Sequence, residues 1–128
     1  MIADTTFLSD WLKELRKEQV GPARKFLIKH RRHPIRTTII SAGEVAVFFD
    51  TSPPAWEWLA KWTIYRLHPG IVNMAADLDR LLMSSGRRLG ENDNWIAGFG
   101  VYYREPIITR DERFKNLPNV RIVEYENA

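Results

Sequence analysis

The sequence predicts an α/β fold, a three-layer α/β/α sandwich around a central, mainly parallel sheet of roughly four to five strands. Short β-branched or apolar runs alternate with helical segments of about 10 to 15 residues, a pattern typical of parallel sheets. The 128 residues, 45% of them hydrophobic, suffice for one core but not for two ordinary domains. Since no repeat, linker or low-complexity segment interrupts the chain, we expect a single domain over residues 1–128.

The N-terminal half is expected to hold two strands separated by helices. After a short apolar start, apolar residues between Phe7 and Leu15 recur at helical spacing. Gly21-Pro22 breaks the chain, and the basic helix that follows stops before Pro34. The expected elements are a strand at 1–3, helices at 5–17 and 23–33, a strand at 35–41 and a helix at 42–50.

The C-terminal half repeats this alternation. Pro53 and Pro54 precede a tryptophan-rich helix, and a weak strand pattern after it ends at Pro69-Gly70. Gly86 closes the next helix. The expected elements are a helix at 55–62, a strand at 63–70, helices at 71–86 and 92–103, a strand and then a short helix within 105–114, and a terminal strand at 120–126.

Composition limits the classes of protein that the chain can belong to. It contains no cysteine, which excludes a disulfide framework and a thiolate zinc site. Asp4 stands where a secretory signal needs basic residues, and charges interrupt every apolar stretch well short of a membrane span. We therefore expect a soluble, cytoplasmic protein with no membrane partner. The net charge of +3 and the pI of about 9.4 permit binding of a polyanion.

Four acidic residues occur where strands are expected to run into helices. Asp4 follows the strand at residues 1–3, Glu44 follows "TTIIS", and Asp111 follows "PIIT". Asp93 lies in the first turn of the helix that contains "NWIAGFG". In open parallel sheets, ligands bind beyond the carboxyl ends of the strands. We therefore expect the four acids to lie at one edge of the sheet.

Each acid also has an alternative role in capping a helix. Asp4 can cap the helix that follows it, Ser41–Glu44 fits a capping box, Asp111 can cap the "ERF" turn, and Asp93 meets free backbone N–H groups. Four carboxylates at one edge would nevertheless repel one another and raise their pKa values unless a cation neutralised them. Oxygen ligands of this kind select Mg²⁺ or Mn²⁺.

Four segments resemble the successive motifs of PIN-domain ribonucleases, particularly the VapC-like toxins of bacterial and archaeal toxin–antitoxin systems. They are "MIADTTFLSDWL", "TTIISAGEVAVFF", "RRLGENDNWIAGFGVYY" and "EPIITRDERFKNLPNVRIVEY". The resemblance covers nearly the whole chain and is weakest between about residues 50 and 70. Its most specific part is "GENDNWIAG" followed by "PIITRD". It implies a PIN-like fold.

The resemblance also implies a set of functional residues and partners. A catalytic, metal-binding acidic quartet with two supporting hydroxyl groups corresponds to Asp4, Glu44, Asp93, Asp111, Thr6 and Thr109. The implied activity is hydrolysis of RNA phosphodiester bonds with water activated by Mg²⁺ or Mn²⁺. The implied protein partners are an antitoxin and a second copy of the chain. Two glycines depart from the family pattern: Gly43 is expected to loosen Glu44, and Gly98 to allow close helix packing.

Basic residues are candidates for holding the RNA backbone. Residues 24–36 carry six lysines and arginines and no acid, which fits either a phosphate-binding surface or the solvated face of a helix. A second set, nearer to the acids in sequence, is Arg87, Arg88, Arg104, Arg110 and Arg113, which the sequence does not rank. His30, His33 and His68 lack the spacing of metal ligands, so we assign them no role.

The tryptophan-rich segment permits two interpretations. Trp58 and Trp62 share one helical face, with Trp56 elsewhere on the helix. They can pack into the core, or they can form a dimer or antitoxin-binding surface, because interface centres are rich in tryptophan. The family resemblance favours the interface.

Three functional hypotheses follow. The leading one is a metal-dependent endoribonuclease that acts as a toxin. The alternatives are a PIN-domain nuclease that serves RNA processing without an antitoxin, and a non-catalytic α/β protein-binding module whose acids only cap helices. A receiver-like phosphoacceptor domain is disfavoured because no lysine ends the "PIIT" strand.

Overall fold

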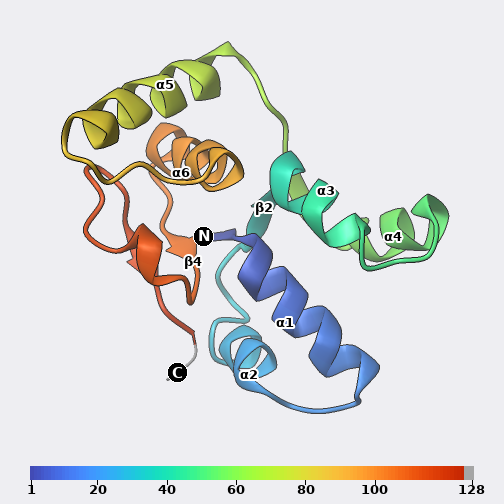
Figure 1. The fold of residues 1–128 in the computed structure, drawn as a ribbon. Helices are drawn as coiled ribbons and strands as arrows, with labels where there is room; N and C mark the ends of the chain where they lie inside the picture. Colours follow the sequence, from blue (N-terminus) through green and yellow to red (C-terminus); the bar gives the residue numbers. More distant parts are fainter. Residues whose placement is uncertain (126–128) are drawn as a thin grey trace.

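The computed structural model describes residues 1–125 and shows a central sheet with helices on both sides (Figure 1). The strands are β1 (Ile2–Ala3), β2 (Arg36–Thr38), β3 (Thr63–Tyr65), β4 (Ile107–Ile108) and β5 (Ile122–Val123). The helices are α1 (Thr5–Arg16), α2 (Pro22–Lys29), α3 (Ile39–Ala46), α4 (Ser52–Leu59), α5 (Pro69–Ser84), α6 (Glu91–Tyr103) and the 3₁₀ helix η1 (Glu112–Phe114). The predicted three-layer α/β/α class is confirmed.

All strand pairs of the sheet are parallel, in the order β3-β2-β1-β4-β5. The first strand lies at the centre, where Ile2 is in register with Arg36 of β2 and with Ile107 of β4. Because the strands point in one direction, their carboxyl ends lie at the same edge of the sheet. Segments distant in sequence therefore meet at that edge.

The two central strands are buried on both faces, which explains their uninterrupted apolar sequence. Ala3 and Ile108 contact the core formed with α1, α2 and α4. Their neighbours Ile2 and Ile107 point to the opposite face, where α5 and α6 cover the sheet. The alternation of side chains along each strand thus divides the core into two layers.

The predicted strand at 35–41 is wrong at its carboxyl end. The strand stops at Thr38 and α3 begins at Ile39. Thr38 is the N-cap of α3, and its hydroxyl oxygen accepts a hydrogen bond from the Ser41 N–H over 3.1 Å. The proposed capping box over Ser41–Glu44 is therefore wrong, and Glu44 lies in the second turn of the helix instead of at its start.

Other elements are confirmed with shifted ends. The helices expected at 23–33 and 42–50 end earlier, at Lys29 and Ala46. The strand expected at 63–70 ends at Tyr65, because the His68 side chain caps α5 by accepting a hydrogen bond from the Gly70 N–H over 3.1 Å. The terminal strand expected at 120–126 is limited to β5, and position 126 lies outside the described residues.

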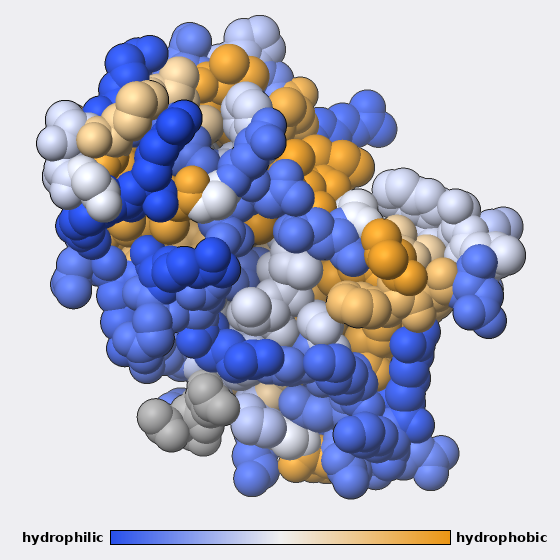
Figure 2. All heavy atoms as spheres, in the orientation of Figure 1, coloured by the Kyte–Doolittle hydropathy of each residue, from blue (hydrophilic) through white to orange (hydrophobic). Residues whose placement is uncertain are grey.

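The tryptophan-rich helix packs largely within its own chain. The helix predicted at 55–62 is α4, which ends at Leu59, so Trp62 lies beyond it and the predicted helical face shared by Trp58 and Trp62 is wrong. Trp58 on α4 is only 8% exposed, and half-buried Trp62 packs edge-on against Trp11, with 4.8 Å between the ring centroids. The core interpretation is confirmed for Trp58. The apolar surface nearby is formed by other residues, chiefly Val47 and Phe48 after α3, and Figure 2 shows hydrophobic side chains gathered over α3 and α4. None of the helices described for residues 1–125 is both long and apolar enough to cross a bilayer.

Close contact between α5 and α6 depends on Gly98. A Cβ atom at this position would lie 2.9 Å from the Cβ of Ala75 and 3.2 Å from its backbone. Real Cβ atoms essentially never approach that closely, so the expectation that Gly98 permits close packing is confirmed. A Cβ atom on Gly43 in α3 would meet no atom within 4 Å.

These two helical glycines should therefore respond oppositely to the same substitution. Gly43→Ala should raise the free energy of unfolding by about 0.5–1 kcal/mol, because alanine is the better helix former and meets no obstacle. Gly98→Ala should lower it by up to about 2 kcal/mol, because overpacking outweighs the gain in helix propensity. Urea unfolding of both variants measures the difference. A stabilising effect of Gly98→Ala would contradict the packing described for α5 and α6.

Candidate active site

Asp4 follows the central strand directly and is the N-cap of α1. Its Oδ1 atom accepts hydrogen bonds from the Phe7 N–H over 3.0 Å and from the Thr6 hydroxyl over 2.7 Å. Asp4 is buried, with only 2% of its surface exposed. The capping role of Asp4 is therefore observed, and Thr6 contacts the Asp4 carboxylate directly. The two hydrogen bonds hold the Asp4 carboxylate at the carboxyl edge of the sheet.

Glu44 reaches the same edge from α3. Its Oε1 atom accepts a hydrogen bond from the Thr5 hydroxyl over 2.6 Å, and the same hydroxyl lies 3.1 Å from the Ser41 hydroxyl. Thr5 is a member of the site that the sequence analysis missed. Its signal is the pair of threonines directly after Asp4, of which only Thr6 was assigned a role.

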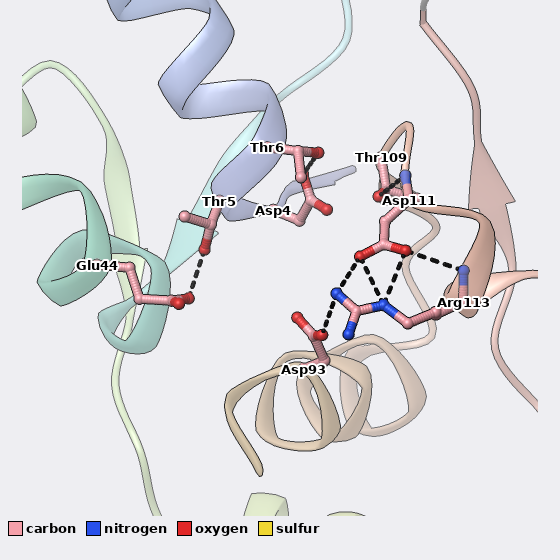
Figure 3. A network of polar contacts seen from close by, with 8 residues as sticks. All are labelled: Asp4, Thr5, Thr6, Glu44, Asp93, Thr109, Asp111 and Arg113. Carbon is pink, nitrogen blue, oxygen red and sulfur yellow. Dashed lines mark hydrogen bonds and ion pairs between the residues drawn. The ribbon is translucent and has the colours of Figure 1, made fainter. Parts of the chain in front are cut away.

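Asp93 and Asp111 approach the site from the other side of the sheet edge (Figure 3). Asp93 lies in the first turn of α6, as predicted. Asp111 caps η1 through a 2.9 Å hydrogen bond from the Arg113 N–H to its Oδ1. Buried Thr109 accepts a 2.9 Å hydrogen bond at its hydroxyl from the Asp111 N–H, which orients the turn after β4.

The guanidinium of Arg113 lies between these two acids. Its Nη2 atom is 2.7 Å from Asp111 Oδ2 and 3.2 Å from Asp93 Oδ2, and its Nε donates to Asp111 Oδ1 over 3.1 Å. Figure 3 shows the side chain bridging α6 and the η1 segment. The sequence placed Arg113 among five unranked arginines. Of those five arginines, only Arg113 lines the cavity that contains the four acids.

All four predicted acids line one open cavity of about 460 Å³. Its walls come from the start of α1, the second turn of α3, the start of α6 and the η1 segment. The residues are Asp4, Thr5, Thr6, Glu44, Gly90, Glu91, Asn92, Asp93, Asp111 and Arg113. Two larger or better enclosed hollows elsewhere, beside α5 and beside Arg104, contain none of these acids. The four predicted acids therefore line one cavity, together with a fifth acid, Glu91, that the sequence did not single out.

Burial and mutual repulsion change the acidity of these groups. Burial raises the pKa of Asp4 to about 6, against the opposing effect of the nearby Thr109 hydroxyl and the bonds from Phe7 and Thr6. Burial also raises the pKa of Asp93; Arg113 opposes that rise, whereas the charges of Asp111 and Glu44 add to it. The pKa of Asp111 is lowered because Arg113 donates hydrogen bonds to its carboxylate. The site therefore carries negative charge that one guanidinium neutralises in part.

The donor set fits a hard divalent cation, although it is not assembled as a coordination shell. Among residues 1–125, no three His, Asp or Glu side chains are grouped closely enough to hold one metal ion. The donors nevertheless are all carboxylate oxygens, the type that Mg²⁺ and Mn²⁺ prefer. A cationic group, the Arg113 guanidinium, already occupies the position between Asp93 and Asp111. The chemistry of the cavity thus suits a cation.

The other basic residues that were candidates for holding RNA, and the histidines, lie away from the cavity or make structural contacts. Arg110 pairs with Asp10 on α1 over 2.6 Å, and Arg88 pairs with Asp79 over 2.9 Å. Arg36, in the basic segment 24–36, pairs with Glu105 before β4. The other five lysines and arginines of that segment are exposed or partly exposed on and after α2. None of the histidines lines the cavity: His68 caps α5, half-buried His30 packs against Phe26, and His33 is exposed.

The buried Asp4 carboxylate gives a prediction about pH. Because its pKa is raised to about 6 in the folded protein, the folded state binds this proton more tightly than the unfolded state between about pH 4 and 6. Deprotonation across that window should therefore cost the metal-free protein up to about 3 kcal/mol of stability. Asp4→Asn keeps the capping oxygen and removes this cost. In urea unfolding with EDTA, the variant should gain stability over the wild type as pH rises from about 4 to about 7.5; an unchanged difference would contradict the burial cost.

Comparisons with known proteins bear on the fold. No protein-family model matches the sequence, and no curated protein matches it. Solved structures do match. A chain of VapBC2 from Rickettsia felis, crystallised with a DNA fragment from their promoter, is 16% identical with a TM-score of 0.78, and the match covers 97% of both chains. A chain of a toxin–antitoxin complex from Klebsiella pneumoniae is 21% identical with a TM-score of 0.72, covering 93% of both.

A third match has higher identity over a shorter length. It is a chain of VapBC-5 from Mycobacterium tuberculosis, a member of the VapBC family of toxin–antitoxin systems. The identity is 26% and the TM-score 0.59, over 70% of this chain and 81% of the other. Identities this low establish architecture and leave function to the site. The protein has the PIN-like α/β/α fold, as its resemblance to VapC-like PIN domains implied.

Proposed function

We propose that the protein is a Mg²⁺- or Mn²⁺-dependent endoribonuclease and the toxin of a toxin–antitoxin pair. The observation that carries this proposal is the convergence of Asp4, Glu44, Asp93 and Asp111 in one cavity at the carboxyl edge of a parallel sheet. These acids come from four elements that are distant in sequence. Helix capping alone gives no reason for four such carboxylates to line one cavity, since their charges repel.

The side chains can be assigned roles in phosphodiester hydrolysis. Asp4, Glu44 and Asp93 would hold the cation directly or through water, and Asp111 would act from further out or serve a second ion. A divalent cation supplies Lewis-acid activation of water and neutralises charge on the phosphate. Bonds from Thr6 and the Phe7 N–H fix Asp4, and Thr5 fixes Glu44. Two of the four ligands are thus held in place beforehand, which lowers the cost of assembling the site.

The charge distribution favours a polyanionic substrate. The formal net charge of the chain is +3, so without the four site carboxylates the rest of the protein would carry +7. A negative cavity that takes up a cation within a positive surround attracts phosphate backbones. By family resemblance, RNA is the substrate that we propose within this class, and the cytoplasm is the compartment in which we propose that it is cleaved.

An antitoxin is the partner that we propose, together with a second copy of the chain. The solved structures with this fold include toxin–antitoxin complexes. This chain offers an apolar surface of its own, because Val47 is 78% exposed, and Phe48 and Trp56 are each about half exposed. Monomeric proteins seldom leave such residues uncovered in a group.

One observation favours the binding-module alternative. Asp4 and Asp111 both cap helices, and Arg113 already neutralises part of the acidic cluster, so these contacts do not by themselves require a metal. A PIN-domain nuclease of RNA processing would share the whole site and lack only the antitoxin. Induced expression, with and without the neighbouring gene, separates these three functions.

Inducing the wild-type chain in bacteria should stop growth and degrade cellular RNA, and co-expressing the neighbouring gene should restore growth. Asp93→Asn should be harmless at equal protein level, because loss of one ligand lowers cleavage by at least about 100-fold. The measurements are growth curves and mapped RNA cleavage ends.

Asp77→Asn is the matched control for this substitution. Asp77 is an exposed residue on α5 that pairs with Arg80 and does not line the cavity, so its variant should remain as toxic as the wild type. If Asp93→Asn and the wild type both leave growth and RNA intact, the toxin function is wrong. RNA cleavage without rescue by the neighbouring gene would favour the RNA-processing nuclease.

A further inference from the structure

Arg113 makes a pattern of contacts that the proposed reaction does not require. It supplies the only positive charge in the lining of the acidic cavity described within residues 1–125. Its guanidinium donates to both oxygens of Asp111 and forms an ion pair with Asp93. It therefore fills the space between two of the four proposed metal ligands.

A basic residue near Asp111 in the chain does not necessarily contact the acids of the cavity, as Arg110 shows. Arg110 is adjacent to Asp111 in the chain, but its guanidinium is held by both oxygens of Asp10, 2.6 and 3.3 Å away. It does not line the acidic cavity. Of the two arginines that flank Asp111, only Arg113 is directed at the acids.

The ion pairs of Arg113 are weak enough for a bound cation to displace its guanidinium. Its side chain is 64% exposed, and the ion pairs of such side chains are worth about 0–1 kcal/mol each. Because most of the Arg113 side chain is exposed, its guanidinium can leave the acids for solvent.

On the basis of the proposed function, we propose that Arg113 is an internal counter-ion that competes with the divalent cation for Asp93 and Asp111. In the metal-free protein it neutralises the repulsion between these carboxylates, and metal binding requires its guanidinium to leave. The same hydrogen bonds from Arg113 hold the pKa of Asp111 below its usual value. Arg113 is in this sense a positioning residue that sets how tightly the site takes up metal.

Calorimetric titration of the purified full chain with Mn²⁺ tests this inference. Arg113→Gln should bind Mn²⁺ about three- to tenfold more tightly than the wild type, because the competitor is gone. Arg110→Gln, which removes the same charge one residue from Asp111, should stay within about twofold of the wild type. Arg113→Lys, which keeps the charge but cannot bridge the two acids in the same way, should lie between wild type and Arg113→Gln.

Thermal unfolding supplies a second readout that does not depend on activity. In EDTA, Arg113→Gln should melt below the wild type, because the acids lose their counter-ion, and Mn²⁺ should raise its Tm by more than it raises that of the wild type.

The outcomes separate this inference from the proposed function. Equal or weaker Mn²⁺ binding by Arg113→Gln, with normal binding by the wild type, would overturn the inference and leave the proposed metal site in place. An equal gain in Arg110→Gln would also overturn it, since a general charge effect would then explain the result. Absence of Mn²⁺ binding in all variants would refute both.

Discussion

The parallel pairing of β1 with β4 determines where the chemistry of this protein can occur. The Asp4 N–H donates to the Ile108 carbonyl oxygen over 3.2 Å, so the ends of the two strands are joined at the point where the acidic residues begin. Both strands are fully buried, which leaves this alignment no freedom to slip. The carboxylates that follow these strands are consequently held near one another. Their mutual repulsion lowers the stability of the folded protein.

Three kinds of interaction within the described residues reduce the repulsion among these carboxylates. Hydrogen bonds from hydroxyl and backbone groups stabilise Asp4 and Glu44. Burial keeps the proton of Asp4 bound to a higher pH than an exposed carboxyl would allow. The guanidinium of Arg113 neutralises the remaining pair. A cluster maintained in this way at the edge of a sheet is a destabilising arrangement, which is typical of a functional site.

The sequence predicts the layers, the order of the elements and the four acids, because hydrophobic periodicity and strand-to-helix transitions are local signals. It does not locate the end of β2, because Ile39 and Ile40 have strand propensity and only the Thr38 cap starts the helix there. The role of Thr5 depends on a contact with Glu44 from a different helix, and that of Arg113 on the spatial meeting of α6 with η1. Such long-range contacts leave no periodic pattern in the sequence.

The most direct test of the account is a crystal structure of the wild-type protein soaked in Mn²⁺, with anomalous diffraction used to locate the metal. The account predicts an anomalous peak in the acidic cavity, within direct or one-water distance of Asp4 and Asp93, and an Arg113 guanidinium displaced from Asp93. An empty cavity at saturating Mn²⁺, with Arg113 still bridging the two acids, would contradict it.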